Sequence, residues 1–487
     1  MQPNIQILPD NILERIIEEA LQLLQSPGVK VGSQEAIDLL YSFGGLVDRD
    51  DGIVHLPEEL VLKALETVPR DFYLYNDSGD PAVHYTENEV HFDPGSSGVN
   101  MLDSETLTHR PAETMDLIHI IQIAEVLNEY DAQSTAVICH DVPEEIGDLY
   151  RLYLVLLFSK KPIVTGAFST DTSQVMFDLL SISAENSRLS SENPRAIFDV
   201  CPSPPLNWTN FASQNLIDLA RANIPAQIVS MPLPGATAPI TLIGSIVQHA
   251  AECLSGIAIH QLANPGAPIV WGGAPAQFNM RHGTTSVGAI ETSMIVSGYA
   301  QVGKFLGLPT HAYLVATDAK LIDAQAGMES GISALSGALT GINMISGAGM
   351  LDFLACQSLE KLVIDAEAIA MAKRYLRGIQ SQNEDLVLEH FEDFNFPGNF
   401  LKHKLTRQMF REEHYMPSSV IDRGSLRHWR ETGSTDTLVR AKSRVEEIIS
   451  SYQRPDISKD KEQALTQLVS SLARAAGMDQ LPKINIK

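Results

Sequence analysis

The stretch PIVWGGAPAQFNMRHGTTSVGAIE, residues 268–291, contains the structural unit that recurs along this chain. It begins with a short apolar run, Pro268–Gly272, of the kind that forms a buried strand. A loop with Gln277, Arg281 and His282 follows, and a helix is expected to begin near residues 284–285. A solvated turn does not need an arginine, a histidine and an aromatic side chain together. The loop is therefore a candidate ligand site.

The same strand–helix unit recurs eight times between about residues 90 and 376. The strands are short apolar runs without alternation, which favours parallel strands buried on both faces. We expect them at Val90–Phe92, Gln133–Cys139, Pro162–Ala167, Ala196–Cys201, Ala226–Met231, Pro268–Gly272, His311–Ala316 and Ile342–Ser346. The helices are expected at about 112–128, 144–159, 171–185, 211–222, 240–263, 285–306, 323–340 and 359–377.

Eight such units over roughly 285 residues fit a (β/α)8 TIM barrel of the α/β class, whose typical length is about 250 residues. A doubly wound open sheet is the alternative, but no GxGxxG follows the first strand. Residues 1–85 are expected to form a small N-terminal α+β region. Residues 86–378 form the predicted barrel, and residues 379–487 a helical C-terminal extension that packs on the barrel or on a neighbouring subunit. The long helical tail also suggests a homo-oligomer.

The charge of the chain excludes some classes of partner. It has 35 Lys and Arg residues against 60 Asp and Glu residues, a formal net charge of −25. That balance argues against nucleic acid and against an anionic membrane surface. The four cysteines form no CxxC pair, and neither HExxH nor a two-His-plus-carboxylate spacing appears, so no metal site is expected. Neither a signal peptide nor an apolar stretch of about 18 residues is visible, which predicts a cytoplasmic protein.

In a TIM barrel the active site lies at the carboxyl ends of the strands. The segments after the expected strands are rich in glycine, proline and aromatic residues. Their few charges are Asp93, Asp141, Arg281, His282 and Asp318. An aromatic-rich mouth suits a quaternary ammonium, held by cation–π contacts, while an arginine or histidine can hold a carboxylate. Core packing is the alternative role for each aromatic residue, and a structural ion pair is the alternative for Arg281.

Several segments resemble the trimethylamine methyltransferase family, whose members transfer a methyl group from an amine to a corrinoid protein. They are GVKVGSQEAIDLL (28–40), MPLPGATAPITLIGS (231–245), FNMRHG (278–283) with Glu291, DAKLIDAQAGMES (318–330), SLEKLVIDAE (358–367) and GNFLKHKLTRQMFREEHYMP (398–417). The founding members contain pyrrolysine, whereas this chain has only ordinary residues. It is therefore similar to the non-pyrrolysine branch, whose characterised members act on quaternary amines such as glycine betaine.

The resemblance implies methyl transfer from a quaternary amine, with glycine betaine the leading substrate, to the Co(I) corrinoid (cobalamin) of a partner protein. This chain itself is expected to bind no cofactor tightly. A quaternary ammonium leaves as a neutral tertiary amine, so the enzyme mainly orients the methyl group and excludes water. Trimethylamine or another betaine- or carnitine-type substrate is an alternative. Two other functions are also alternatives. One is a barrel lyase or hydrolase with His140 or His282 as base, and the other is a non-catalytic barrel that binds small amines.

The expected site residues fall into four sets, and no catalytic residue is assigned. The candidate cage aromatics are Phe92, Trp208, Phe211, Tyr313 and Phe353. Arg281 or His282 would bind a substrate carboxylate. The floor would be shaped by Met231, Gly235, Thr237 and Gln277. The polar candidates at the mouth after the seventh strand are Asp318, Asp323, Gln325 and Glu329.

Overall fold

Eight parallel strands form the centre of the molecule in the computed structural model, which describes residues 2–48, 50–184, 192–381, 386–391 and 398–484. They hydrogen-bond in the order β6-β18-β17-β14-β13-β11-β10-β9. Their bounds are β6 His91–Pro94, β9 Gln133–Ser134, β10 Ile163–Thr165, β11 Ala196–Val200, β13 Ala226–Ile228, β14 Ile269–Gly273, β17 Thr310–Tyr313 and β18 Met344–Ala348.

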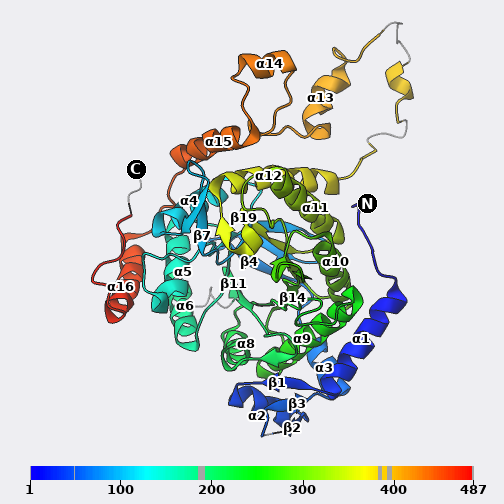
Figure 1. The fold of residues 1–487 in the computed structure, drawn as a ribbon, viewed down its shortest axis with the longest axis vertical. Helices are drawn as coiled ribbons and strands as arrows, with labels where there is room; N and C mark the ends of the chain where they lie inside the picture. Colours follow the sequence, from blue (N-terminus) through cyan, green and yellow to red (C-terminus); the bar gives the residue numbers. More distant parts are fainter. Residues whose placement is uncertain (1, 49, 185–191, 382–385, 392–397, 485–487) are drawn as a thin grey trace.

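Backbone hydrogen bonds bring the two ends of this sheet together. The Asp131 amide donates to the Phe92 carbonyl at 2.8 Å, and the Gly98 amide donates to the Ala136 carbonyl at 2.9 Å. Each strand is followed by a helix, and the helices surround the strands (Figure 1). These helices are α4 Thr114–Val126, α5 Gly147–Phe158, α6 Thr170–Ser183, α8 Asn210–Ala222, α9 Leu242–Ala263, α10 Ile290–Phe305, α11 Ala324–Thr340 and α12 Leu359–Leu376. The predicted (β/α)8 barrel is confirmed.

A hairpin closes the amino-terminal end of the barrel. Its strands are β4 Phe72–Tyr75 and β5 Pro81–Tyr85. Leu74, Val83 and Tyr85 form one buried cluster with residues of the barrel strands, namely Ala132, Val164, Ile197, Val270 and Met344. This plug shuts one end of the barrel, so a small molecule can enter only from the carboxyl end, hereafter the mouth.

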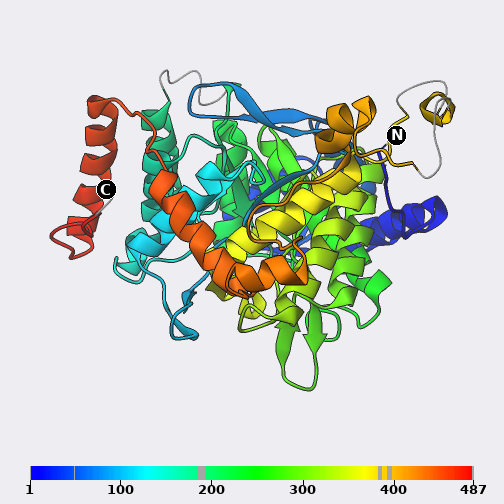
Figure 2. The ribbon, with the colours of Figure 1, turned by 90° about the horizontal axis from the view of Figure 1, so that it is seen from above.

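Other short strands build the rim of the mouth. Strands β15 Gln277–Asn279 and β16 Thr284–Ser286 form a hairpin that projects from the face opposite β4–β5 (Figure 2). A four-stranded sheet joins the loops after β6 and β18, with strands β7 Asn100–Asp103, β8 Thr108–Pro111, β19 Met350–Leu351 and β20 Cys356–Gln357. Short 3-10 helices lie at η1 Glu144–Ile146 and η2 Asp352–Leu354.

The β15–β16 hairpin corrects the expected start of the sixth helix. Residues 284–286 are a strand, and α10 begins at Ile290 rather than near 284–285. Gly283, with φ +66°, turns the chain, and the two threonines that follow favour an extended backbone. The loop after the sixth strand is therefore a protruding ribbon.

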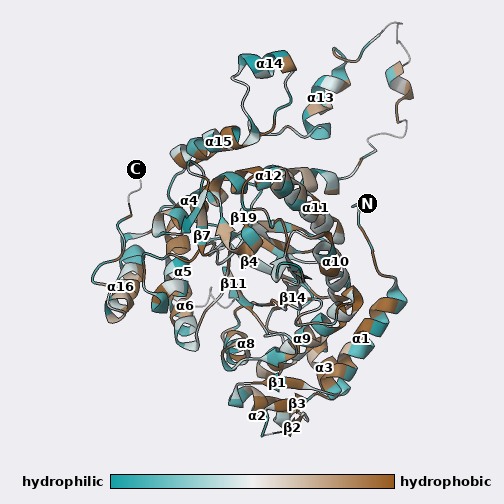
Figure 3. Ribbon diagram, viewed as in Figure 1, coloured by the Kyte–Doolittle hydropathy of each residue, from teal (hydrophilic) through white to brown (hydrophobic). Residues whose placement is uncertain are grey.

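The N-terminal region packs on the outside of the helix ring. Its sheet has the order β12-β1-β3-β2, in which β12 Asn207–Trp208 comes from a barrel loop. The remaining elements are α1 Asp10–Gln25, β1 Val29–Val31, α2 Gln34–Ser42, β2 Leu46–Asp48, β3 Ile53–His55 and α3 Glu58–Glu66. Figure 3 shows both hydrophobic and hydrophilic residues along α1, and its buried residues, such as Leu13 and Leu24, form one apolar face.

The C-terminal extension lies mostly along the side of the barrel. Helix α15 Thr437–Ser451 packs on α12 and α4, and α16 Lys459–Ala475 packs on α5 and α6. The extension also includes η3 Leu388–Phe391, α13 Lys404–Glu413 and α14 Leu426–Glu431. At the rim of the mouth, Lys442 of α15 donates to Glu105 of the β7–β8 turn at 2.8 Å.

Helix α9 is long and apolar enough, by length and composition, to cross a membrane. However, 83% of its most apolar window is buried inside the protein, where α9 packs against α1, α3, α8 and α10. The same apolarity is expected of a helix covered on all sides in a globular core. We therefore assign α9 to the globular core, where it lies between the barrel strands and the N-terminal region.

Two helical glycines give a matched test of this packing. A Cβ at Gly256 of α9 would lie 2.5 Å from Trp208 Cζ2, whereas a Cβ at Gly331 of α11 would meet nothing within 4 Å. Gly256→Ala should lower the free energy of unfolding by about 1–3 kcal/mol through overpacking. Gly331→Ala should raise it by about 0.5–1 kcal/mol, because alanine favours the helix. Urea unfolding of both variants measures this, and an equal effect on both would contradict the packing.

Candidate functional site

A hydrogen bond across the barrel interior marks the centre of the mouth. The Tyr313 hydroxyl, at the end of β17, donates to Asp199 Oδ2 of β11 at 2.8 Å. Gln227 Nε2, from β13, donates to Asp199 Oδ1 at 2.7 Å. Burial raises the pKa of Asp199 to about 6, although both hydrogen bonds favour the carboxylate. Tyr313 and Asp199 are only half-buried, so the pair faces the mouth.

A second buried acid lies beside this pair. Ser346 Oγ donates to Asp93 Oδ1 at 2.6 Å, and His311 Nε2 lies 3.1 Å from Ser346 Oγ. Burial raises the pKa of Asp93 well above its usual value, and the negative charge of Asp199 raises it further. Burial also lowers the pKa of His311 to about 3, which keeps the imidazole neutral near pH 7. Asp93 Oδ2 and His311 Nδ1 are buried without a hydrogen-bond partner.

Cys201, which follows β11, lies at the same end of the barrel as Asp199 and Tyr313. Its side chain is exposed to solvent, yet burial among protein atoms raises the pKa of its thiol to about 12. The thiol is therefore neutral, and Asp199 supplies the negative charge on this side of the mouth.

The other side of the mouth carries a cation. Arg151 of α5 reaches the carboxyl ends of the strands, where its Nη1 donates to Ser97 Oγ and to the Thr135 carbonyl, both at 2.9 Å. The guanidinium carbon lies 4.7 Å from the ring centroid of Phe168, in the loop after β10. The Thr135 hydroxyl lies 3.2 Å from that of Thr165, which adds a second polar group to this wall.

The five predicted cage aromatics do not come together. Tyr313 lies in the mouth, whereas Phe92 and Trp208 are fully buried in the core. Trp208 Nε1 donates to Ser255 of α9 at 2.9 Å, and Phe211 packs at the edge of the core. The ring of Phe353 already makes a cation–π contact with Lys320, whose Nζ lies 3.6 Å from the ring centroid.

Arg281 and His282, the predicted carboxylate ligands, lie at the exposed turn of the β15–β16 hairpin. Gln277 begins that hairpin, and its amide donates to Thr292 Oγ1 at 3.0 Å. The predicted floor residues Met231, Gly235 and Thr237 form a neighbouring loop. A Cβ at Gly235 would lie 2.6 Å from Met280 Cε of the hairpin turn, so the hairpin rests on this loop.

The predicted polar residues after β17 organise the rim of the mouth. Glu329 accepts hydrogen bonds from the Asp318 amide at 2.8 Å and from Gln325 Nε2 at 2.9 Å. Asp318 accepts from the Gly288 amide at 3.0 Å. Asp323 caps α11 by accepting from the Ala326 amide at 3.1 Å. These contacts join the loop after β17 to the segment that precedes α10.

The alternative base His140 does not pair with its neighbour Asp141. His140 is exposed, and Asp141 Oδ1 accepts from the Thr114 amide at 2.9 Å, at the start of α4. Within the described ranges, no group of three or more His, Cys, Asp and Glu residues is placed to hold a metal ion.

Sequence reasoning missed Asp199, His311 and Arg151. The signal for Asp199 is a single charge within the apolar strand AIFDV, and His311 shares the two-residue period of Tyr313, which places both on one face. Arg151 belongs to a helix, and nothing in its local sequence shows that it reaches the mouth.

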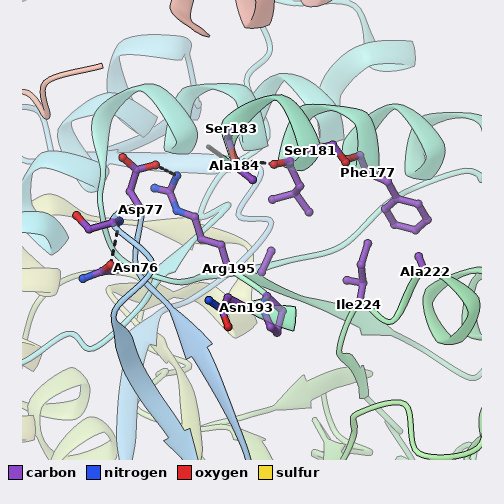
Figure 4. Close-up of a pocket in the computed structure, with 15 residues that line it drawn as sticks. Asn76, Asp77, Phe177, Ser181, Ser183, Ala184, Asn193, Arg195, Ala222 and Ile224 are labelled. Carbon is purple, nitrogen blue, oxygen red and sulfur yellow. Dashed lines mark hydrogen bonds and ion pairs between the residues drawn. The ribbon is translucent and has the colours of Figure 1, made fainter. Parts of the chain in front are cut away.

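A separate pocket lies at the amino-terminal end of the barrel (Figure 4). It is lined by residues of the β4–β5 turn and the ends of α6 and α8, including Asp77, Phe177 and Ile224. Its arginine, Arg195, is neutralised within the protein, because Nη1 pairs with Asp77 Oδ1 at 2.8 Å. Asp199 and Tyr313 lie at the opposite end of the strands, so this pocket is distinct from the mouth.

Comparisons with known proteins agree with this architecture. The family model described as trimethylamine methyltransferase matches residues 1–477. The trimethylamine methyltransferase MttB of Methanosarcina thermophila is 31% identical over 456 residues, covering 92% of this chain and 93% of that protein. The glycine betaine methyltransferase of Desulfitobacterium hafniense (strain Y51) is 25% identical over 477 residues, covering 98% of each.

Among solved structures, the fold is similar to that of the monomethylamine methyltransferase MtmB of Methanosarcina barkeri. The TM-score is 0.54 at 11% sequence identity, over 98% of this chain and 89% of that chain. At this identity the likeness concerns the fold alone.

The raised pKa of Asp199 predicts a pH-dependent stability. Because its pKa rises from 3.8 to about 6 on folding, the folded carboxyl keeps a proton that the unfolded chain has lost between these values. Its contribution to stability is therefore lost as pH rises through 6. Asp199→Asn removes this titration. From pH 5 to pH 8 the free energy of unfolding of the variant should therefore rise by about 1.4 kcal/mol relative to that of the wild type. Urea unfolding at both pH values measures the gain, and a difference that is independent of pH would contradict it.

Proposed function

We propose that this chain, which belongs to the trimethylamine methyltransferase family, transfers a methyl group from a quaternary amine to the corrinoid of a partner protein. Glycine betaine is the leading substrate. The observation that carries the proposal is the half-buried Asp199–Tyr313 pair at the carboxyl end of the barrel strands. The family assignment makes the chain a methyltransferase, and the chemistry of this pair suits a cationic methyl donor.

A quaternary ammonium has no N–H group and is attracted by charge and by aromatic faces. The Asp199 carboxylate supplies the charge, and the half-buried ring of Tyr313 supplies aromatic surface. Such a cation near a carboxylate gains about 4 kcal/mol at 4 Å and an effective dielectric constant of 20. The same cation next to Asp199 would favour the carboxylate form and lower the pKa of this residue.

The partner's Co(I) corrinoid would supply the nucleophile that accepts the methyl group. The task of this chain is to hold the N–CH3 bond in line with that nucleophile and to keep water away. The substrate loses its positive charge as the tertiary amine leaves. The hydrogen bonds from Tyr313 and Gln227 spread the charge of Asp199. These hydrogen bonds therefore limit how strongly Asp199 favours the cationic substrate over the neutral amine product.

The rim of the mouth supports a partner that approaches from the carboxyl end. Phe168, Met280 and Ile240 are exposed there by 47%, 64% and 63% of their surfaces. Exposed apolar side chains around a recess are typical of an interaction surface. The β4–β5 hairpin closes the opposite end, which leaves the mouth as the route to Asp199.

Trimethylamine is the second candidate substrate, because relatives with that printed name reach 31% identity against 25% for the glycine betaine enzyme. The chemistry favours the quaternary amine. A neutral amine needs activation before it can lose a methyl group, and this chain contains only ordinary residues.

The substrate proposal is tested by methyl transfer to reduced cobalamin, with and without a corrinoid protein, using glycine betaine, choline, carnitine and trimethylamine. We expect transfer from a quaternary amine. Tyr313→Phe should lower kcat/KM by roughly 10- to 100-fold, because it removes the hydrogen bond that orients Asp199. The matched control is Tyr73→Phe, on the hairpin at the opposite end of the barrel, which should leave kcat/KM unchanged. Transfer from trimethylamine alone would overturn the substrate proposal.

A further inference from the structure

Arg151 is a buried cation that forms no ion pair with a described residue. Its side chain is 0% exposed, and among the described residues no carboxylate oxygen lies within 4.0 Å of it. Arg195, whose side chain is only 9% exposed, pairs with Asp77 at 2.8 Å. The buried Asp148 of the same helix acts on Arg151 electrostatically without forming an ion pair with it. Buried N–H groups of a guanidinium without acceptors are costly, and they are retained where a ligand supplies the missing acceptor.

The hydrogen bonds of Arg151 leave one edge of its guanidinium free. Nη1 donates to Ser97 Oγ and to the Thr135 carbonyl, which anchors one corner of the group. Nε is buried without a partner, and Nη2 makes no hydrogen bond within the described chain. Nε and Nη2 lie on the same edge, which is the edge that binds a carboxylate through two parallel hydrogen bonds.

The free edge belongs to the same mouth as the acidic pair. Ser97 and Thr135 follow β6 and β9 at their carboxyl ends, and Phe168, stacked on the guanidinium, follows β10. Asp148 of the same helix acts on Arg151 most strongly among the nearby charged groups, and Tyr313 is also near enough to act on it electrostatically. Burial lowers the pKa of Arg151 only to about 10, so the group stays charged at neutral pH. The mouth therefore has a negative side at Asp199 and a positive side at Arg151.

We propose that Arg151 binds the carboxylate of a zwitterionic substrate whose quaternary ammonium lies against Asp199 and Tyr313. This inference rests on the proposed function and assigns the carboxylate to a residue other than the exposed Arg281 and His282 of the hairpin turn. A molecule with an ammonium and a carboxylate a few bonds apart satisfies both sides of the mouth. A cation without a carboxylate leaves Arg151 unpaired.

The test compares glycine betaine with choline, which has the same trimethylammonium group and a hydroxyl in place of the carboxylate. Methyl transfer is measured for the wild type, Arg151→Gln, Arg151→Lys and Arg281→Gln, each checked for folding by circular dichroism. In Arg151→Gln we expect KM for glycine betaine to rise by roughly 10- to 100-fold and KM for choline to change less than about twofold. Arg151→Lys should restore part of the loss, because it keeps the charge without the fork.

A structural role for Arg151 predicts a different result. With a structural role, Arg151→Gln would raise KM for glycine betaine and KM for choline by the same factor. That outcome overturns the inference. A selective loss of glycine betaine in Arg281→Gln, with none in Arg151→Gln, overturns it as well.

Calorimetry without any corrinoid separates this inference from the proposed function. Wild-type protein and Arg151→Gln are titrated with glycine betaine, alone and in the presence of acetate. Arg151→Lys takes the place of Arg151→Gln if the latter does not fold. Arg151-dependent binding that acetate weakens, without methyl transfer from any amine, would support the inference and reject the proposed function. If methyl transfer from choline occurs and the Arg151 substitutions do not change the binding of glycine betaine, the proposed function is supported and the inference is rejected. If the wild type binds neither glycine betaine nor acetate, the inference is overturned.

Discussion

Closure of the eight parallel strands is the constraint on which the rest of the structure depends. Once β6 meets β9, alternate side chains of every strand share one enclosed interior. Apolar residues fill the amino-terminal half, where Tyr85 of the β4–β5 hairpin completes the packing. Polar residues fill the carboxyl half, and they can satisfy one another only by hydrogen bonds across the barrel. The Tyr313–Asp199 bond, which joins β17 to β11, is the clearest of these.

This polar half is only partly satisfied internally. Asp93 Oδ2, His311 Nδ1 and Arg151 Nε are all buried without partners. Buried polar atoms in a folded protein are rarely left unpaired, and exceptions gather where a ligand or water completes the bonding. These unpaired atoms, which belong to an acid, a neutral imidazole and a cation, lie in the carboxyl half of the barrel. The opposite end of the barrel contrasts with this, since Arg195 and Asp77 neutralise each other there.

The fold could be predicted further than the site. The strands and helices of the barrel lie close to the expected positions, because buried parallel strands and their covering helices have distinct apolar patterns. The expected start of the sixth helix was wrong, because the polar segment after Gly283 could extend a loop, a helix or a hairpin equally well. Among the predicted site residues, the half-buried Tyr313 ends strand β17, whereas Trp208 packs in the core against Ser255. An aromatic residue after a strand has no local feature that separates these two positions.

By itself, the sequence determined the strand–helix rhythm, the barrel and the family, since each depends on patterns or motifs that are read along the chain. Only the tertiary structure decided which charges share the mouth. Arg281 follows a strand and ends on an exposed turn, while Arg151 lies in the middle of a helix and reaches Ser97 and Thr135. The physical reason is that closure of the barrel sets the distance between residues far apart in sequence. A buried charge is defined by those neighbours and not by its own segment.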